Sequence, residues 1–461
     1  MTSPSVVASA SSPASQLPAI ARAILAQAWP VLVAQLAVMA AGLVDTVLTG
    51  HATPADLAAM GIGTSVYASV FVSLTGVVNA LNPIIAQLYG AEQDAAIGAS
   101  YVQGLWLALL LSAVGIPLLA LPEVWLQLID PSPEVHELVT RYLRVLSLGL
   151  PASLLFRVLY ALNTAISRPK VVMVLQAAGL ALKVVLSAML IFGLLGLPRL
   201  GAVGAALATV VVFWLLFLVG LGYTSMDAAY RRFAVCFAWP RWQPLRDQLR
   251  LGIPMGMSYM LENTSFTLIA LLIARLGTTT VGGHQIVSNL TAVSYQVPLA
   301  IAIATATMTA QALGAGDRGR ARTVGFVGIG LGVLVASCTA GTIWMLRPAV
   351  ISLYTNEAAV ATVALSLVGY FAALHVFDAL QGVTGFVLRA HRIAVVPTVI
   401  YAFALWGPGL IGGYGVAFYP ILGGPRGAQG MWLMLAVALG LTAALLLGFY
   451  LWVLRQHEGE P

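Results

Sequence analysis

Three carboxylates lie within long apolar stretches of this sequence, at Asp45, Glu262 and Asp378. A charged side chain at the depth of a lipid bilayer costs about 2.5 to 3.5 kcal/mol on insertion scales, so it usually faces a cavity or a partner of opposite charge. Apolar stretches of this length are typical of membrane spans. These three acids are therefore the first candidates for a functional site.

Glu262 and Asp378 both belong to the second half of the chain, in which the sequence places no Lys or Arg inside an apolar stretch. Two neighbouring acids in a low-dielectric cavity cannot both ionise cheaply, so together they favour the binding of a proton or a metal cation. The pattern predicts a cation-coupling site, with both residues as metal ligands if the cation is Na⁺. A purely structural role for the two acids is the alternative.

Asp45 differs because Lys183 could reach it if the two helices that carry them face one another. Both a buried structural ion pair and a role in transport remain open for Asp45. Arg157 is the other basic residue that the sequence places within the membrane in this half. Arg141 lies nearer a helix end, where Glu137 at i, i+4 can pair with it.

The composition indicates a protein surrounded by lipid. Of 461 residues, 60% are apolar and only 8% are charged, which is too few charges for a soluble surface. One helical crossing takes about 20 apolar residues, so this length supplies about a dozen crossings. Cys236 and Cys338 form no CxxC pair, and no enzyme motif, metal centre, bound cofactor or nucleic-acid interface is indicated.

Clusters of Gly, Pro and charge divide the apolar sequence into twelve segments, which predicts an all-α membrane protein. The segments start near Gln27, Gly61, Ile97, Val135, Val171, Ala202, Leu249, Val281, Arg322, Ala358, Ile393 and Ala428. The predicted units are a disordered cytoplasmic tail at 1–26, an N-lobe of helices 1 to 6 at 27–224, a cytoplasmic linker at 225–248, a C-lobe of helices 7 to 12 at 249–454 and a cytoplasmic tail at 455–461.

The Lys and Arg residues outside the predicted spans are distributed unevenly. If the N-terminus is cytoplasmic, 14 of them fall on the cytoplasmic side and 4 on the other side. Cytoplasmic loops concentrate Lys and Arg, so the count predicts that both termini are cytoplasmic. This count places Arg389 and Arg392 in a cytoplasmic loop.

Short motifs recur between the two halves. Ala86-Gln87-Leu88-Tyr89-Gly90-Ala91 returns as Ala310-Gln311-Ala312-Leu313-Gly314-Ala315, and Trp29-Pro30 returns as Ile253-Pro254, both at an offset of 224. Matches in register over this length indicate a tandem repeat. With six helices in each half, the halves are parallel and related by an axis along the membrane normal. Such a duplication leaves a central cleft between two lobes.

Four segments together resemble a known family. They are Gly42-Leu43-Val44-Asp45-Thr46-Val47, Leu261-Glu262-Asn263 followed by Ala270-Leu271-Leu272, Gly283-His284-Gln285-Ile286, and Asp378-Ala379. With them, nearly the whole chain after the tail resembles the multidrug and toxic compound extrusion (MATE) family, in its NorM-type bacterial branch. The resemblance implies a V-shaped pair of six-helix bundles that switches between outward-open and inward-open states.

The resemblance also implies roles for particular residues. The family's acids at the positions of Glu262 and Asp378 are implicated in cation coupling, and the acid at Asp45 in coupling or substrate binding. The family positions that line the drug-binding region are here Ser65, Phe266, Gln285 and Asn289.

Two departures from the family pattern bear on the coupling ion. NorM-type relatives tend to carry Asn at the positions of Lys183 and Ser187, so here an ammonium group joins Asp45 in the N-lobe polar site and opposes sodium there. Leu374 stands where an aromatic residue often precedes the acid of the tenth helix, which removes a possible sodium ligand. His375 and His284 are candidates for a proton path or for ordinary polar packing.

The expected function is secondary active multidrug efflux, in which H⁺ or Na⁺ is exchanged for amphipathic organic cations by alternating access. The expected setting is a bacterial inner membrane, with a monomeric protein and no cofactor. The nearest alternative is a lipid-linked oligosaccharide flippase of the wider superfamily, which needs a more basic cavity than Arg157 and Lys183 supply. A passive channel is a further alternative that uphill extrusion would exclude.

Overall fold

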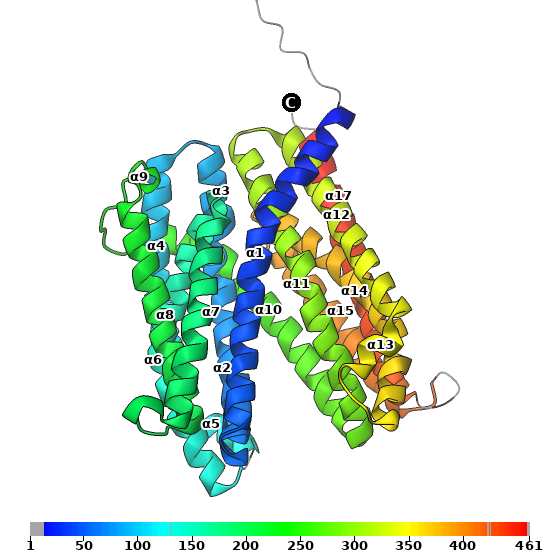
Figure 1. Ribbon diagram of the computed structural model, residues 1–461. Helices are drawn as coiled ribbons and strands as arrows, with labels where there is room; N and C mark the ends of the chain where they lie inside the picture. Colours follow the sequence, from blue (N-terminus) through cyan, green and yellow to red (C-terminus); the bar gives the residue numbers. More distant parts are fainter. Residues whose placement is uncertain (1–12, 130, 422–423, 425, 459–461) are drawn as a thin grey trace, which may run out of the picture.

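The protein is a bundle of long helices arranged in two lobes (Figure 1). The computed structural model describes residues 13–129, 131–421, 424 and 426–458. Within these residues, twelve helices are long and apolar enough to cross a membrane. The prediction of an all-α protein with twelve spans is confirmed.

The N-lobe contains the first six spans. Short helices stand beside the long ones, and α2 and α3 together form one span from Pro54 to Gly90. The helices are α1 (Pro13–Gly50), α2 (Pro54–Val78), α3 (Leu81–Gly90), α4 (Asp94–Ala120), α5 (Glu123–Ile129), α6 (Pro133–Ala165), α7 (Pro169–Phe192) and α8 (Gly201–Met226).

The C-lobe contains the other six spans, after a connection that carries the short helix α9 (Ala228–Arg231). The eleventh span is continuous from Val395 to Phe418, with a π-helical segment at Leu405–Gly412 between two α-helical parts. The helices are α10 (Trp242–Ala274), α11 (Thr278–Gly314), α12 (Arg318–Met345), α13 (Arg347–Ser352), α14 (Ala358–Ala390), α15 (Val395–Ala404), α16 (Gly413–Phe418) and α17 (Gly427–Glu458).

The first helix starts well before the predicted boundary at Gln27. Residues 1–12 lie outside the described part of the chain, but α1 is helical from Pro13, so residues 13–26 are not a disordered tail. Ile24 and Ala28 are buried against Ile301 of α11 in the other lobe. This packing, added to the helix-forming Ala, Leu and Gln residues of the segment, explains the longer helix.

Two other predicted boundaries are also wrong by several residues. The linker predicted at 225–248 is shorter, because α8 continues to Met226 and α10 already begins at Trp242. Leu245 is buried, and Gln248 donates a hydrogen bond to the carbonyl oxygen of Ser100 at 3.2 Å, so contact with α4 supports this earlier start of the helix. The tail predicted from 455 is helical to Glu458.

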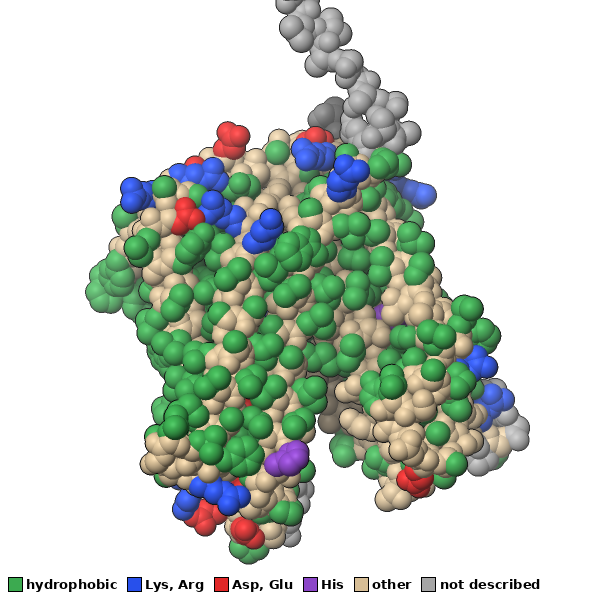
Figure 2. Space-filling view, viewed as in Figure 1, with side chains coloured by type: hydrophobic (Ala, Val, Ile, Leu, Met, Phe, Trp, Pro, Cys, Tyr) green, Lys and Arg blue, Asp and Glu red, His purple; other side chains and the backbone are tan. Residues whose placement is uncertain are grey.

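The outer surface suits a lipid environment. Apolar side chains cover the middle of the visible face, and Lys and Arg gather mainly at the end of the molecule where α1 begins (Figures 1 and 2). At the opposite end the same view shows a hollow between the two lobes. The lobes therefore meet near the termini and separate at the other end.

The repeated motif found in the sequence forms the contact between the lobes. A Cβ atom on Gly90 of α3 would lie 1.9 Å from the carbonyl oxygen of Gln311, and one on Gly314 of α11 would lie 1.9 Å from that of Gln87. Gln87 donates to the carbonyl oxygen of Ala390 in the C-lobe at 2.8 Å, and Gln311 donates to that of Ala165 in the N-lobe at 2.7 Å. The two halves of the repeat thus hold each other in the same way.

Replacing Gly90 with Ala should loosen this contact. Overpacking costs about 1 to 3 kcal/mol, so the closed contact should open roughly tenfold more often. The measurement is the rate of maleimide labelling of an Ala310→Cys probe, buried in this contact, after Cys236 and Cys338 are changed to Ser. Gly222→Ala is the matched control, since nothing lies within 4 Å of its added methyl group. Equal labelling rates for both variants would contradict the assignment.

Candidate functional site

The N-lobe acid Asp45 is held in an ion pair. The Nζ atom of Lys183 on α7 lies 2.9 Å from Oδ2 of Asp45 on α1, and the Ser187 hydroxyl donates to Oδ1 at 2.8 Å. Lys183 is 4% exposed and Ser187 is fully buried. The pairing that the sequence left open is therefore present.

Lys183 has an acceptor for each of its three N–H groups. Besides Asp45, it donates to the carbonyl oxygen of Ala205 at 2.8 Å and to the hydroxyl of Thr209, both on α8. The ion pair thus connects α1, α7 and α8. Because Lys183 already compensates the negative charge of Asp45, this site offers no unpaired negative charge to a coupling cation.

The C-lobe acids face a common cavity. Glu262 of α10 and Asp378 of α14 both line a cavity of about 520 Å³, which C-lobe residues form except for Val72 of α2. Gln381 donates a hydrogen bond to Oδ1 of Asp378 at 2.9 Å, and Tyr401 donates in turn to Gln381. Glu262 has no hydrogen bond or ion pair within the described residues. Because the two carboxylates line one cavity, the negative charge of each disfavours ionisation of the other.

Of the four residues predicted to line the drug-binding region, two line this cavity and two lie outside it. Phe266 and Gln285 line the cavity with the two acids. Ser65 lies outside it and donates to the carbonyl oxygen of Gly61 in its own helix. Asn289 also lies outside it and accepts a hydrogen bond from the Tyr354 hydroxyl at 3.1 Å.

The two nominated histidines have different surroundings. His284 lines the cavity, and its Nδ1 atom accepts a hydrogen bond from the Trp432 indole at 3.1 Å. His375 is fully buried, stacks on the Phe371 ring and has no hydrogen-bond partner for either ring nitrogen among the residues described. No group of three or more His, Cys, Asp or Glu side chains capable of holding a metal ion occurs in this part of the chain.

The sequence misplaced Arg389, and with it the claim that the C-lobe has no basic residue within the membrane. Arg389 belongs to the last turn of α14, which continues to Ala390, and it is only 5% exposed. Its guanidinium donates to the Tyr259 hydroxyl at 3.0 Å and lies over the ring of Phe386. Contact between the lobes covers this helix end, a burial that hydropathy along the sequence does not report.

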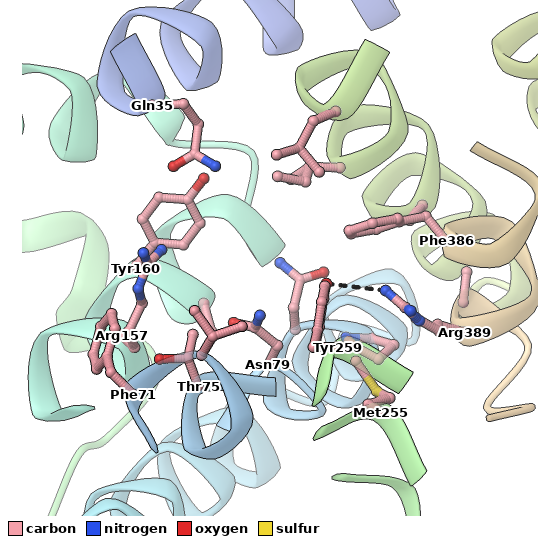
Figure 3. Close-up of a pocket in the computed structure, with 18 residues that line it drawn as sticks. Gln35, Phe71, Thr75, Asn79, Arg157, Tyr160, Met255, Tyr259, Phe386 and Arg389 are labelled. Carbon is pink, nitrogen blue, oxygen red and sulfur yellow. Dashed lines mark hydrogen bonds between the residues drawn. The ribbon is translucent and has the colours of Figure 1, made fainter. Parts of the chain in front are cut away.

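Arg389 faces a second cavity, of about 290 Å³, that both lobes line (Figure 3). Arg157 of α6 enters it from the N-lobe, and its guanidinium lies over the rings of Phe71 and Tyr160. Tyr259 lines this cavity and the acidic cavity alike. The site therefore consists of adjoining acidic and basic cavities.

Comparison with known proteins identifies the family of this chain. A family model described as MatE matches residues 30–189 and 254–414, once in each half. The chain belongs to the MatE family. The second match begins at the offset that relates the repeated motifs, in agreement with two homologous lobes.

Relatives match nearly the full length of the chain. It is 40% identical to a probable multidrug resistance protein NorM of Aromatoleum aromaticum, over 96% of this chain and 95% of that protein. It is 35% identical to a probable multidrug resistance protein NorM of Chromobacterium violaceum, over 94% and 93%. These identities confirm the predicted resemblance to the NorM-type branch.

The fold matches solved MATE transporters. The crystal structure of the eukaryotic MATE transporter AtDTX14 superposes with a TM-score of 0.86 at 20% identity, over 94% of this chain and 96% of that one. The predicted pair of six-helix bundles is confirmed. MatE family membership also confirms that the chain is a transporter and not an enzyme.

In this MatE protein, Lys183→Met should be strongly destabilising. Removing one partner of a buried ion pair leaves the other charge uncompensated and costs about 3 to 5 kcal/mol. The double variant Asp45→Asn with Lys183→Met should regain most of this loss, because no unpaired charge remains. Thermal unfolding of the purified protein in detergent measures both effects. A double variant no more stable than Lys183→Met alone would show that the pair does not stabilise the lobe.

Proposed function

We propose that this protein exports amphipathic organic cations from the cell in exchange for H⁺ or Na⁺. The observation that supports it is the cavity lined by both Glu262 and Asp378, two carboxylates that have no ion-pair partner within 4 Å among the residues described. Such a cavity binds either an inorganic cation or the positive group of an organic molecule.

The exchange follows from competition between states of the transporter. A cationic molecule occupies the cleft while the two acids are ionised, and binding of H⁺ or Na⁺ from outside favours its release. The molecule and the ion need not contact the same atom. They need only favour different states by a few kcal/mol.

Alternating access is supported by the arrangement of the two lobes. They contact one another near the termini, through Gln87 and Gln311, and a hollow separates them at the other end (Figure 2). With both termini in the cytoplasm, as the Lys and Arg distribution favours, this is an outward-open state. We propose a monomer in a bacterial inner membrane, because each chain supplies both sides of the cleft.

Coupling is proposed to reside in the C-lobe. In the N-lobe, Lys183 already neutralises Asp45, so a second cation there would meet like charge. Phe266 and Tyr295 add aromatic surface beside Glu262 and Asp378, and aromatic faces attract organic cations. Gln285 adds a polar group to the same cavity. Leu374 also lines it, and because its side chain has no oxygen atom that could bind Na⁺, this position favours H⁺ as the coupling ion.

A lipid-linked oligosaccharide flippase fits the site less well. Its pyrophosphate would need a basic cavity, and Lys183 is already bound by three acceptors. Arg157 and Arg389 do supply positive charge, but the adjoining cavity carries Glu262 and Asp378. Those acids would repel a pyrophosphate.

The test is ethidium efflux from proteoliposomes under an imposed pH gradient or an imposed sodium gradient. The unchanged protein should move ethidium uphill with one of these gradients, which identifies the ion. Glu262→Gln or Asp378→Asn should lower this efflux at least tenfold, because each removes a charge that exchanges its cation.

Glu137→Gln is the matched control, since Glu137 is exposed and pairs with Arg141 outside both cavities. It should retain efflux, and all variants should unfold at similar temperatures. Full efflux by either cavity variant would refute the assignment of that acid. Efflux that proceeds only downhill, independent of both gradients, would refute the exchange itself.

A further inference from the structure

The basic cavity between the lobes contains two guanidinium groups and no carboxylate. Arg157 projects into it from α6 of the N-lobe and Arg389 from α14 of the C-lobe, with Tyr259 between them (Figure 3). The acids of the neighbouring cavity, Glu262 and Asp378, do not line it. The cavity is therefore positively charged within a membrane protein that otherwise has few charges.

The two guanidinium groups are poorly compensated by the protein. The guanidinium of Arg157 lies over two rings, with its Cζ atom 5.8 Å from the Phe71 centroid and 5.4 Å from that of Tyr160, and it has no hydrogen bond within the described chain. Arg389 has a single neutral acceptor, the Tyr259 hydroxyl. A guanidinium carries five N–H donors, so most of the donors of this pair remain available to a ligand.

We propose that this cavity is a subsite for an acidic group, foremost a carboxylate, of a bound molecule. A planar guanidinium binds a carboxylate through two parallel hydrogen bonds, and the strength of such bonds increases where water is scarce. Because the two arginines come from different lobes, a bound carboxylate would contact both lobes at once. Asn79 and Gln35 line the same cavity and offer further amide donors.

The position of the subsite determines what kind of molecule fits. Val72 and Tyr259 line both cavities, so the two are contiguous. One molecule can therefore place an acidic group between the arginines and a basic group beside Glu262 and Asp378. This inference rests on the proposed function and specifies that ligands carrying both charges are held at both ends.

Arg389 alone could serve instead to moderate the charge of Glu262, because the cavities that these two residues line share Tyr259 and Val72. Arg157 has no such role available, because it belongs to the other lobe and is not within 4 Å of any described carboxylate oxygen. The decisive variant is therefore Arg157→Gln. Arg141→Gln on the same helix is its matched control, since Arg141 is exposed and pairs with Glu137.

The experiment compares the equilibrium binding of a rhodamine dye that carries a free benzoate with binding of the methyl ester of the same dye. The protein is in lipid nanodiscs without any ion gradient, and dye fluorescence polarisation gives Kd. The unchanged protein should bind the benzoate dye at least about tenfold more tightly than its ester, as a charge-assisted bidentate pair allows. Arg157→Gln should bring the ratio near one, and Arg141→Gln should leave it unchanged.

Binding of the ester by Arg157→Gln shows that this variant is folded. Raising the chloride concentration tests whether a free inorganic anion competes, and the ester is the control for the accompanying change in ionic strength. If chloride weakens binding of the benzoate dye but not of the ester, the result would support an anion subsite that small ions also enter. Equal affinities for dye and ester in the unchanged protein, or a ratio that survives Arg157→Gln, would overturn the proposal. Neither result depends on transport, so failure of the subsite is distinct from failure of the exchange function.

Discussion

A charge within a membrane must be matched by a partner, by water or by a ligand, and this constraint governs the interior of the protein. Asp45 and Lys183 match each other and connect three helices of the N-lobe. Glu262 and Asp378 share a cavity that no described Lys or Arg lines. We propose that these two acids, which form no ion pair within the described chain, are the groups that bind a cation.

The contact between the lobes shows how the same chain can close one face and open the other. Gly90 and Gly314 allow two helix ends to approach within backbone contact, and Gln87 and Gln311 add one hydrogen bond in each direction. Apolar packing of α1 against α11, in which Ile24 and Ile301 are buried, adds to this contact. The alternating access that we propose requires all of these surfaces to separate.

The sequence predicted those features that depend on local composition. Twelve apolar segments can be recognised because each must be apolar enough to cross the bilayer, and the three acids within them stand out because charges there are rare. The sequence missed features that depend on tertiary contact. Residues 13–26 are helical because Ile24 packs against the other lobe, and Arg389 is buried because the lobes cover it. The family pattern nominated Ser65 and Asn289, which lie outside both cavities.

The central claim is that a cationic ligand and the coupling ion exclude each other at Glu262 and Asp378. The most direct measurement is the number of protons or sodium ions released when tetraphenylphosphonium binds to the purified protein at equilibrium, followed with a pH indicator and with a sodium-selective electrode. The account predicts release of about one cation per ligand bound, and no release when both acids are replaced by their amides. Ligand binding without any release, in the unchanged protein over the range of pH and sodium in which it binds, would contradict it.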